Sequence, residues 1–562
     1  MWHGFVETLR HHPEMALFLT LAIGYGIGKI RLGALPLGAV VGVLIAGVVI
    51  GQLGVKISSD LKTAFFLLFL FAIGYRTGPQ FFSGLRSSGL PQVALTMIFA
   101  GAGLGTAYAL AKAFGYDAGT AMGLLAGGLT ESATLGTGSD AVNRLSIEAA
   151  AKSQMISNAT VAFAVTYFLG VVTTLTFLAR LGPKILRVDL AAECKALEKE
   201  MGVTAGEGEA ATGYRVFVAR AYRVEGEIAG RTVDEIERGF RAIGHRVYIP
   251  RVRHGGKVVD ANAGMRVEGG DAISLAGRVG WVIADSAAIG PEIDDKELLD
   301  FPVESLEVVV TSDTVIGKTL GELQSGEDEQ ARGVGLEKIV RAGVELPRAP
   351  KTVIGRGDVV TLRGHVPDVE RVAKAIGYAD RASAVTDMVG VGAAVFIGGM
   401  IGIPALLVGK LEIGLSQSVG VLLGGLVFGW LRSVNRRFGR VPEGALWLFD
   451  SVGLAAFLAA TALAAGPDFV TGLQKSGVSL VIAGIVLPVV PLVVTLLVGR
   501  YLFRMHPGIL LGVCCGACTS APSLAAVQEV AKSKIPTLGY GVTYAVGNVL
   551  LALWGTVIVM MM

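Results

Sequence analysis

Residues 78–89 read Gly-Pro-Gln-Phe-Phe-Ser-Gly-Leu-Arg-Ser-Ser-Gly, and residues 466–477 read Gly-Pro-Asp-Phe-Val-Thr-Gly-Leu-Gln-Lys-Ser-Gly. Seven of the twelve aligned positions are identical, at an offset of 388 residues, and each copy follows a long apolar run. A hydrophobic segment interrupted by Gly and Pro at matching positions of two halves is the sequence feature that best marks the binding site of a secondary transporter. We therefore expect helix breaks at Gly78-Pro79 and at Gly466-Pro467.

The composition is that of a membrane protein. The chain has 562 residues, of which 52% are hydrophobic, and its mean hydropathy is +0.60. Its 78 glycines are about twice the usual share, which suits closely packed membrane helices. The net charge of +3 indicates no particular partner, and we expect a lipid bilayer around the protein and no nucleic acid.

Nothing in the sequence points to an enzyme, a cofactor or a metal. The chain contains no HExxH motif, no phosphate-binding P-loop and no nucleophile elbow, and its charged region lacks a GxGxxG fingerprint. Cys514, Cys515 and Cys518 lie in an apolar segment, at a spacing that is poor for zinc. We expect no catalytic residue, no metal ligand and no cofactor.

Ten apolar stretches are long enough to span a bilayer, five on either side of a charge-rich region at 184–380. They cover residues 14–30, 34–53, 57–77, 90–114 and 155–182, and then 384–409, 414–431, 445–465, 478–500 and 538–561. Two shorter segments rich in Gly, Ser and Thr, at 120–136 and 508–526, are interpreted as re-entrant hairpins or broken helices, one in each half.

Two further matches keep the order of the repeat. Residues 127–135 align with residues 516–524 at an offset of 389, and a weaker match aligns residues 161–165 with residues 542–546. Because five spans is an odd number, the second half enters the membrane in the opposite sense. The sequence thus predicts a polytopic α-helical protein with two inverted five-span repeats, whose hairpin tips meet near the midplane.

The Lys and Arg residues between the spans predict the orientation, because inner loops carry an excess of them. An external N-terminus places the following residues inside: Lys29, Arg31, Arg86, Arg180, Lys184, Arg187, Arg432, Arg436, Arg437, Arg440, Arg500 and Arg504. It leaves fewer outside: Lys56, Lys62, Lys112, Lys410 and Lys475. The charge-rich region at 184–380 is then expected to be cytoplasmic.

The charge-rich region is itself a repeat. Residues 228–232 match residues 315–319, and residues 270–277 match residues 357–364, both at an offset of 87. Short strands bounded by Gly-Asp turns, with a helix near 232–243, predict two small α+β subdomains. The predicted division of the chain is a membrane repeat at 1–183, a linker at 184–212, subdomains at 213–290 and 291–380, and a membrane repeat at 381–562.

With the paired halves, the twin insert and the Gly-Tyr-Arg-Thr-Gly-Pro-Gln-Phe-Phe run at 74–82, the whole chain resembles the aspartate:alanine exchanger family of bacterial transporters. The insert resembles two C-terminal subdomains of potassium-uptake regulators (RCK-C, or TrkA-C). The resemblance implies exchange of small anionic amino acids or dicarboxylates by a homodimer in a bacterial inner membrane. It does not separate exchangers from succinate exporters, and no residue identifies a small regulatory ligand on the insert.

Arg76 is the leading candidate for a substrate-binding residue. It ends the apolar run from Thr63 to Tyr75 and directly precedes the Gly78-Pro79 pair. Arginine offers a fixed fork that pairs bidentately with a carboxylate. The alternative is an ordinary positive charge at the inner end of a helix. The equivalent repeat position is Ala464, so the charge is not explained by the repeat alone.

Hydroxyl groups are dense in both predicted hairpins. Helix ends expose backbone N–H groups that bind carboxylates, and hydroxyls add further donors. The alternative is that small polar residues only allow close helix packing. The candidate substrate-lining residues are Thr130, Glu131, Ser132 and Thr134 in the first hairpin, and Thr519, Ser520 and Ser523 in the second.

Three ionisable residues lie within or beside predicted spans, where such residues are functional candidates. Glu131 could bind the ammonium group of a substrate or carry a coupling proton. Asp450 could have a functional role or be a partner in a structural ion pair. Lys62 and Asp450 occupy equivalent positions of the repeat, at the offset of 388.

The broken repeats predict a secondary transporter that works by alternating access. The family resemblance implies that it exchanges L-aspartate for L-alanine, with net charge movement. A succinate-like dicarboxylate is the alternative cargo. An RCK-regulated cation channel or antiporter is the rival suggested by the insert, although no selectivity-filter run such as Thr-Val-Gly-Tyr-Gly is present. A membrane sensor without transport is disfavoured by irregular backbone at membrane depth.

Overall fold

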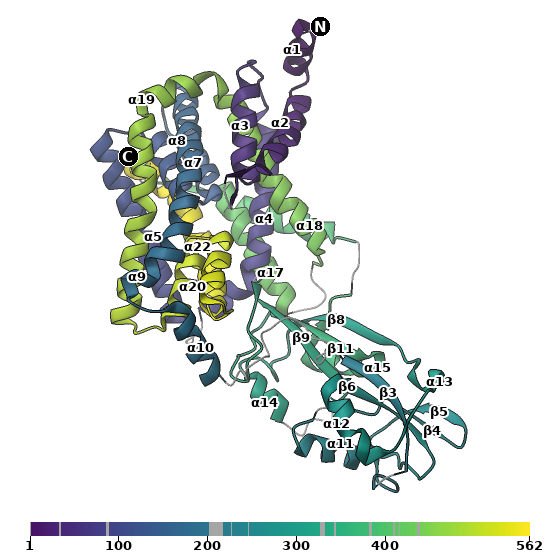
Figure 1. The fold of residues 1–562 in the computed structure, drawn as a ribbon. Helices are drawn as coiled ribbons and strands as arrows, with labels where there is room; N and C mark the ends of the chain where they lie inside the picture. Colours follow the sequence, from purple (N-terminus) through teal and green to yellow (C-terminus); the bar gives the residue numbers. More distant parts are fainter. Residues whose placement is uncertain are drawn as a thin grey trace. The chain divides into compact units, whose positions relative to one another are not determined.

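The computed structural model divides into two compact units (Figure 1). The first comprises Met1–Glu198, Arg341–Leu346 and Ala382–Met562, and the second Lys199–Val340 and Pro347–Arg381. The structure describes residues 2–32, 35–85, 89–201, 217–225, 227–245, 247–325, 332–341, 344–381, 385–408, 411–414, 416–434 and 439–562. Arg86, Lys410, Arg436 and Arg437, and residues 202–212 of the predicted linker, lie outside these ranges.

The first unit is mostly helical. Before the insert its helices are α1 (Trp2–His11), α2 (Pro13–Gly28), α3 (Ala39–Gly51), α4 (Ser59–Gly84), α5 (Leu90–Phe114), α6 (Ala118–Gly128), α7 (Ser132–Arg144), α8 (Ala149–Thr176), η1 (Phe177–Leu181), α9 (Gly182–Leu186) and α10 (Leu190–Glu200). After the insert they are α16 (Met388–Gly402), α17 (Gln417–Val434), α18 (Glu443–Trp447), η4 (Leu448–Val452), α19 (Gly453–Leu497), η5 (Val498–Leu502), α20 (Pro507–Ala517), α21 (Ala521–Ala531) and α22 (Thr537–Met561).

Seven helical stretches among the described residues are long and apolar enough to cross a membrane. They are Ser59–Gly84, Leu90–Phe114, Ala149–Leu186, Gln417–Val434, Glu443–Pro467, Ser476–Leu502 and Thr537–Met561. The stretches predicted as full spans at 14–30, 34–53 and 384–409 hold helices of only 16, 13 and 15 residues. Short antiparallel hairpins follow α2 and α16, pairing β1 (Arg31–Leu32) with β2 (Leu35–Pro36) and β13 (Ala405–Val408) with β14 (Leu411–Gly414).

The predicted break at Gly78-Pro79 is wrong. Helix α4 continues through both residues to Gly84, with Pro79 inside it. Gly78 serves close packing instead, since a Cβ there would lie 2.2 Å from the carbonyl oxygen of Leu426 in α17. A Cβ at Gly429 of α17 would likewise lie 2.0 Å from the carbonyl oxygen of Tyr75 in α4. Small residues on both faces let the two backbones approach closely, as is usual between membrane helices.

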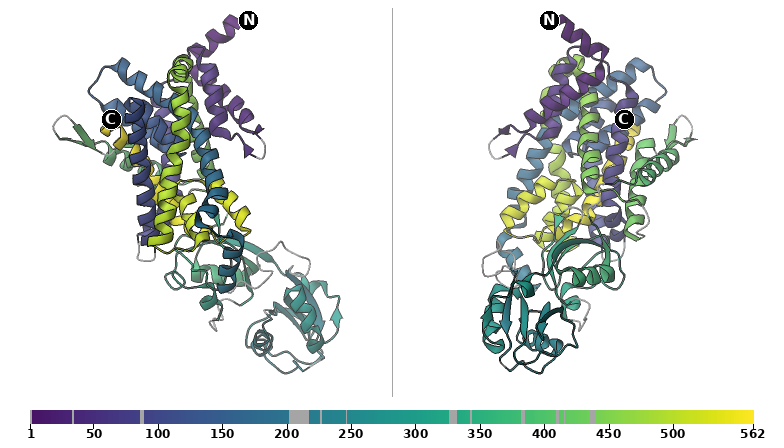
Figure 2. Two further views of the ribbon diagram at one scale, coloured as in Figure 1. Left: turned by 60° about the vertical axis from the view of Figure 1, so that its left-hand side comes forward. Right: turned by 90° about the vertical axis from the view of Figure 1, so that its right-hand side faces the viewer.

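The Gly466-Pro467 pair does not end a helix either. Helix α19 is continuous over 45 residues and contains Pro467, Pro488 and Pro491. Helix α19 joins two membrane-length stretches: Glu443–Pro467, which begins with α18 and η4, and Ser476–Leu502, which ends with η5. The ribbon changes direction between them (lime green in Figure 1). The second part lies beside α5, as Figure 2 shows. Gly466 packs on Gly51 of α3, where a Cβ would lie 2.6 Å from the Gly51 carbonyl carbon.

We expect Gly78→Ala to destabilise the protein, because its Cβ meets backbone atoms that cannot swing away. Overpacking of this kind costs about 1–3 kcal/mol. Gly101→Ala in α5 is the matched control, since a Cβ at Gly101 meets nothing within 4 Å. Thermal unfolding of the purified protein in detergent should show a lower Tm for Gly78→Ala and an unchanged or slightly higher Tm for Gly101→Ala. Equal Tm values for the two variants would refute the packing role of Gly78.

The two halves of the first unit make matching helix contacts. A Cβ at Gly127 of α6 would lie 2.1 Å from Thr166 Oγ1 of α8, and one at Gly516 of α20 would lie 1.9 Å from Thr543 Oγ1 of α22. These contacts equate Thr166 with Thr543, an offset of 377. The weak sequence match of residues 161–165 with 542–546 is therefore displaced by four residues, about one helical turn.

The described residues between 217 and 379 contain two sheets of five strands with equivalent orders, β5-β4-β6-β3-β7 and β10-β9-β11-β8-β12. The strands are β3 (Phe217–Arg223), β4 (Arg251–His254), β5 (Lys257–Asp260), β6 (Ala272–Arg278), β7 (Glu292–Ile293), β8 (Val303–Val310), β9 (Val334–Arg341), β10 (Val344–Glu345), β11 (Val359–His365) and β12 (Gly377–Ala379). The accompanying helices are α11 (Val233–Ala242), α12 (Val279–Ile289), α13 (Lys296–Leu299), α14 (Leu320–Ser325) and α15 (Val366–Ile376).

Equivalent turns and caps recur in the two subdomains. Gly230 and Gly317 have φ values of +84° and +83°, a conformation that favours glycine. Glu235 accepts a hydrogen bond from the Thr232 N–H at 2.8 Å, and Glu322 accepts one from the Thr319 N–H at 2.7 Å. These backbone hydrogen bonds hold the pKa of both carboxyl groups below the ordinary value.

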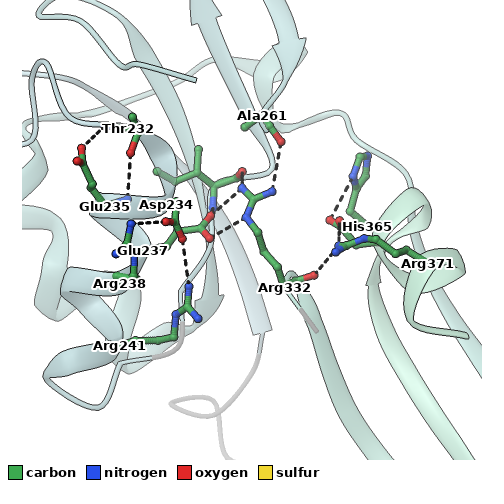
Figure 3. A network of polar contacts seen from close by, with 12 residues as sticks. Thr232, Asp234, Glu235, Glu237, Arg238, Arg241, Ala261, Arg332, His365 and Arg371 are labelled. Carbon is green, nitrogen blue, oxygen red and sulfur yellow. Dashed lines mark hydrogen bonds and ion pairs between the residues drawn. The ribbon is translucent and has the colours of Figure 1, made fainter. Parts of the chain in front are cut away.

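A buried ion pair joins the two subdomains (Figure 3). Arg332 donates from Nε to Glu237 Oε2 at 2.7 Å and from Nη2 to Oε1 at 2.8 Å. It also donates to the carbonyl oxygens of Ile249 at 3.1 Å and Ala261 at 3.3 Å. The carbonyl oxygen of Arg332 in turn accepts a hydrogen bond from Arg371 at 3.1 Å. The Glu237 side chain is 2% exposed, so this contact is shielded from solvent.

We expect Arg332→Met to destabilise the insert strongly, because it leaves the buried Glu237 carboxylate without its charge partner. Removal of one partner of a buried pair typically costs about 3–5 kcal/mol. Arg238→Ala is the control, since its pair with Asp234 is more exposed and should be worth about 1 kcal/mol or less. Hydrogen exchange of the full-length protein should show faster exchange across residues 233–260 in Arg332→Met only. Equal exchange in the two variants would contradict the prediction.

Candidate functional site

Two helix junctions in the first unit have the same backbone form. Helix α6 ends at Gly128 and α7 begins at Ser132, while α20 ends at Ala517 and α21 begins at Ala521. Between them, Thr130 has a φ of +59° and Thr519 a φ of +52°. Positive φ is uncommon for residues other than glycine, and it often marks a functional segment. Both threonines were candidates in the sequence, at the repeat offset of 389.

Each junction places a side-chain oxygen at the start of a helix. The Glu131 carboxylate accepts a hydrogen bond from the Ala133 N–H at 3.1 Å and caps α7. The Ser520 hydroxyl accepts one from the Ser523 N–H at 3.3 Å and caps α21. Helix N-termini carry partial positive charge. The α7 terminus therefore has a resident carboxylate, whereas the α21 terminus has a neutral cap.

The two junctions are in contact. Thr130 Oγ1 donates a hydrogen bond to the Cys518 carbonyl oxygen at 3.4 Å, across 388 residues of sequence. The Glu131 carboxylate of one junction also interacts with the Thr519 side chain of the other. Glu131 is 4% exposed. The fold thus brings the polar segments of both halves to one place.

Arg76 is paired with two carboxylates. Its Nη1 lies 3.0 Å from Asp450 Oδ2, and its Nη2 lies 3.0 Å from Glu443 Oε1. The Arg76 and Asp450 side chains are 28% and 31% exposed, whereas Glu443 is 81% exposed. Asp450 lies in η4, a single turn of π-helix, which is a feature found frequently at functional sites.

The charged cluster lies within electrostatic range of the junctions. Asp450 interacts electrostatically with Glu131. Tyr544 of α22 is half-buried and interacts electrostatically with Asp450, Glu131 and Arg76. Arg76, Asp450, Glu131, Thr519 and Tyr544 therefore form one candidate site.

Other predicted residues have different surroundings. The Thr134 hydroxyl donates to the Leu551 carbonyl oxygen at 2.7 Å, so it joins α7 to α22. The Ser523 hydroxyl lies 2.8 Å from that of Ser520. Ser132 is buried at the first position of α7. Lys62 is away from Asp450: it interacts electrostatically with Asp140 and lies 5.9 Å from the Phe457 ring centroid.

Two carboxylates, Asp140 and Glu443, were missed by the sequence reasoning. Asp140 lies just beyond the hairpin predicted at 120–136, and its carboxylate accepts a hydrogen bond from Ser418. Glu443 lies just before the span predicted at 445–465 and pairs with Arg76. A count of every carboxylate within a few residues of an apolar run would have found Asp140 and Glu443.

Among the described residues, no group of three or more His, Cys, Asp or Glu side chains could hold a metal ion. Cys514, Cys515 and Cys518 are free thiols, and all three are buried. The candidate site consists of fixed charges, hydroxyl groups and helix termini. Such a set can bind a carboxylate through arginine and N–H donors, and an ammonium group through a carboxylate.

Proteins similar to this one match it over nearly the whole chain. A family model of the aspartate–alanine exchanger type, described as a predicted permease membrane region, matches residues 16–182 and 390–560. An uncharacterized transporter of Shewanella oneidensis is 41% identical over 563 residues, which cover 99% of each chain. One of Bradyrhizobium diazoefficiens is 39% identical over 91% of this chain and 99% of its own. One of Bordetella parapertussis is 38% identical over 98% of this chain and 97% of its own. No solved structure matches.

Proposed function

Since this chain belongs to the aspartate–alanine exchanger family of predicted permeases, we propose that it is a secondary transporter that exchanges L-aspartate for L-alanine. The observation that carries this proposal is the contact of the two junctions, Thr130 with Cys518, beside the Arg76–Asp450 pair. Inverted-repeat transporters bind substrate where irregular backbone from both halves meets.

The site matches the chemistry of aspartate. The Arg76 fork is suited to a carboxylate, which would compete with Asp450 for the same guanidinium. The α21 terminus has a neutral cap, Ser520, so its partial positive charge and the Ser520 hydroxyl are available to a carboxylate. The Glu131 carboxylate suits the ammonium group that aspartate and alanine share.

For the transport cycle we propose alternating access between two helix groups. The first group consists of α2, α3, α4, α16, α17 and Glu443–Pro467, which pack on one another. The second consists of α5, α6, α7, α8, Ser476–Leu502, α20, α21 and α22. The matching glycine contacts of α6 with α8 and of α20 with α22 support two repeats, and the odd number of predicted spans per half supports their inversion.

The remaining assignments extend the same proposal. The protein lies in a bacterial inner membrane as a homodimer, with its N-terminus external and residues 184–380 cytoplasmic. The insert consists of two RCK-C-like subdomains, supported by the equivalent strand orders, and is where a small regulatory ligand would act. Aspartate carries one more negative charge than alanine, so their exchange moves net charge.

A dicarboxylate such as succinate is the second candidate substrate. The Arg76 fork favours it, because arginine recognises the carboxylate and is indifferent to the amino group. Glu131 disfavours it, because succinate has no ammonium group to pair with a buried carboxylate. The Glu131 carboxylate therefore favours aspartate and disfavours succinate.

Counterflow in proteoliposomes tests the proposal. Vesicles are loaded with unlabelled aspartate, alanine, succinate or buffer, and uptake of radiolabelled aspartate is followed. We expect uptake with aspartate or alanine inside and a rate that changes with an imposed potential. Uptake driven by succinate alone would assign the protein to dicarboxylate transport. No uptake with any filling, from folded protein, would overturn the exchanger proposal.

A further inference from the structure

A second charged cluster lies outside the candidate site. The Asp140 carboxylate of α7 accepts a hydrogen bond from the Ser418 hydroxyl of α17 and interacts electrostatically with Lys62 of α4. Ser416, just before α17, contributes another hydroxyl to the same carboxylate. Lys62 Nζ lies 5.9 Å from the centroid of the Phe457 ring. The Asp140 carboxylate of α7 thus has partners from both α4 and α17.

This cluster is distant from the proposed substrate contacts. Lys62 precedes Arg76 by 14 residues on the same helix, which corresponds to about 21 Å along the axis. Asp140 follows Glu131 by nine residues, or about 13 Å if the spacing is helical. Neither residue is placed to bind the same small substrate as Arg76, so the cluster needs a role of its own.

Apart from Arg144 in its own helix, the partners of Asp140 belong to the first helix group. Lys62, Ser418 and Phe457 are in the first group, whereas Asp140 is in α7 of the second. By contrast, Arg76, Asp450 and Glu443 are all in the first group, so their ion pairs can persist while the groups move. The Asp140 contacts cannot persist if α7 moves relative to α4 and α17.

We infer that Lys62, Asp140 and Ser418 form a lock that holds the two helix groups in the state shown here and opens once in each transport cycle. The inference rests on the proposed alternating access. It adds a conformational role for residues that do not touch the substrate, and it makes the Lys62–Asp140–Ser418 cluster a determinant of exchange rate.

Both charged partners keep other interactions when the lock is open. Asp140 interacts electrostatically with Arg144, one helical turn along α7, so the two can move together. Lys62 retains the Phe457 ring of its own group, a cation–π contact. When the lock opens, each of the two charged side chains still interacts with a residue of its own helix group. Neither charge is left without a partner, which a reversible lock requires.

Covalent linking tests the inference. In the full-length variant Lys62→Cys/Asp140→Cys, a short bifunctional methanethiosulfonate is applied and aspartate counterflow is measured before linking, after linking and after reduction. We expect linking to lower exchange at least tenfold and reduction to restore it. The control is Tyr116→Cys/Ser479→Cys, since these hydroxyls hydrogen-bond at 2.8 Å and both lie in the second group. Linking the control pair should leave exchange unchanged.

Exchange at the unlinked rate in linked Lys62→Cys/Asp140→Cys protein would overturn the lock. If the unlinked double variant is inactive, exchange by the charge-exchanged variant Lys62→Asp/Asp140→Lys is measured instead. It should exceed the exchange of either single substitution at least tenfold, and a folded variant without rescue overturns the inference. Absence of exchange in the wild-type protein would instead overturn the proposed function, so the two failures are distinguishable.

Discussion

Arg76→Ala should lower aspartate counterflow at least about 100-fold, which corresponds to about 2.7 kcal/mol. The substitution removes the guanidinium fork that we assign to a substrate carboxylate, and it leaves Asp450 without its partner at 3.0 Å. Initial rates of counterflow at several aspartate concentrations measure the loss. Arg76→Lys should retain part of the activity, because it keeps the charge but cannot pair bidentately.

A second variant separates substrate binding from neutralisation of Asp450. In Arg76→Ala/Asp450→Asn, the half-buried carboxylate is removed together with its partner, and the carboxylate that remains, Glu443, is 81% exposed. We expect the double variant to remain as inactive as Arg76→Ala. Recovery of exchange in the double variant would show that Arg76 serves only to balance Asp450, and would remove it from the substrate site.

Glu131→Gln should shift selectivity from aspartate toward succinate, with the ratio of their kcat/KM values falling at least about tenfold. Glutamine preserves the size of the side chain and can still accept the Ala133 N–H, so the cap of α7 is retained. It loses the negative charge that we assign to the ammonium group of the substrate. Uptake of both radiolabelled substrates by the same proteoliposomes gives the ratio.

The matched control for Glu131→Gln is Ser520→Ala, at the equivalent junction. Ser520 caps α21 without charge, so its loss should weaken both substrates to a similar degree. An unchanged aspartate-to-succinate ratio in Glu131→Gln would contradict the role of Glu131. If only the pH dependence of exchange changed, Glu131 would be a proton carrier and not a ligand of the substrate.

The sequence predicted the helical membrane character and the family, and both are confirmed. Long apolar runs are recognisable because a membrane helix needs many consecutive apolar residues. The family was recognisable from the run at 74–82 together with the twin insert. The lengths of the helices α2, α3 and α16 were overestimated, because composition does not show where a helix ends and a β-hairpin begins.

The predicted helix breaks failed for a physical reason. Gly-Pro in an apolar run is equally compatible with a broken helix and with a continuous helix packed closely on a neighbour. At Gly78 the neighbour is α17, whose own glycines lie more than 300 residues away in sequence. No local pattern could distinguish the two cases, because the deciding contact is between distant segments.

The pairing of Asp450 also required the structure. The repeat equates Lys62 with Asp450, but equivalence in a repeat is not contact. Asp450 pairs with Arg76, which is 374 residues away in sequence, and Lys62 faces Asp140. The junction residues were more predictable, since Thr130 and Thr519 occupy matching positions of a repeat that the sequence shows directly.

The central claim is that the junctions at Thr130 and Thr519 form the substrate site. Single cysteines at these two positions, in protein whose Cys194, Cys514, Cys515 and Cys518 are replaced by alanine, can be labelled with a methanethiosulfonate reagent with and without aspartate. We predict that aspartate slows labelling at both positions and that succinate slows it less. Unchanged labelling at both positions, in protein that still exchanges aspartate, would contradict it.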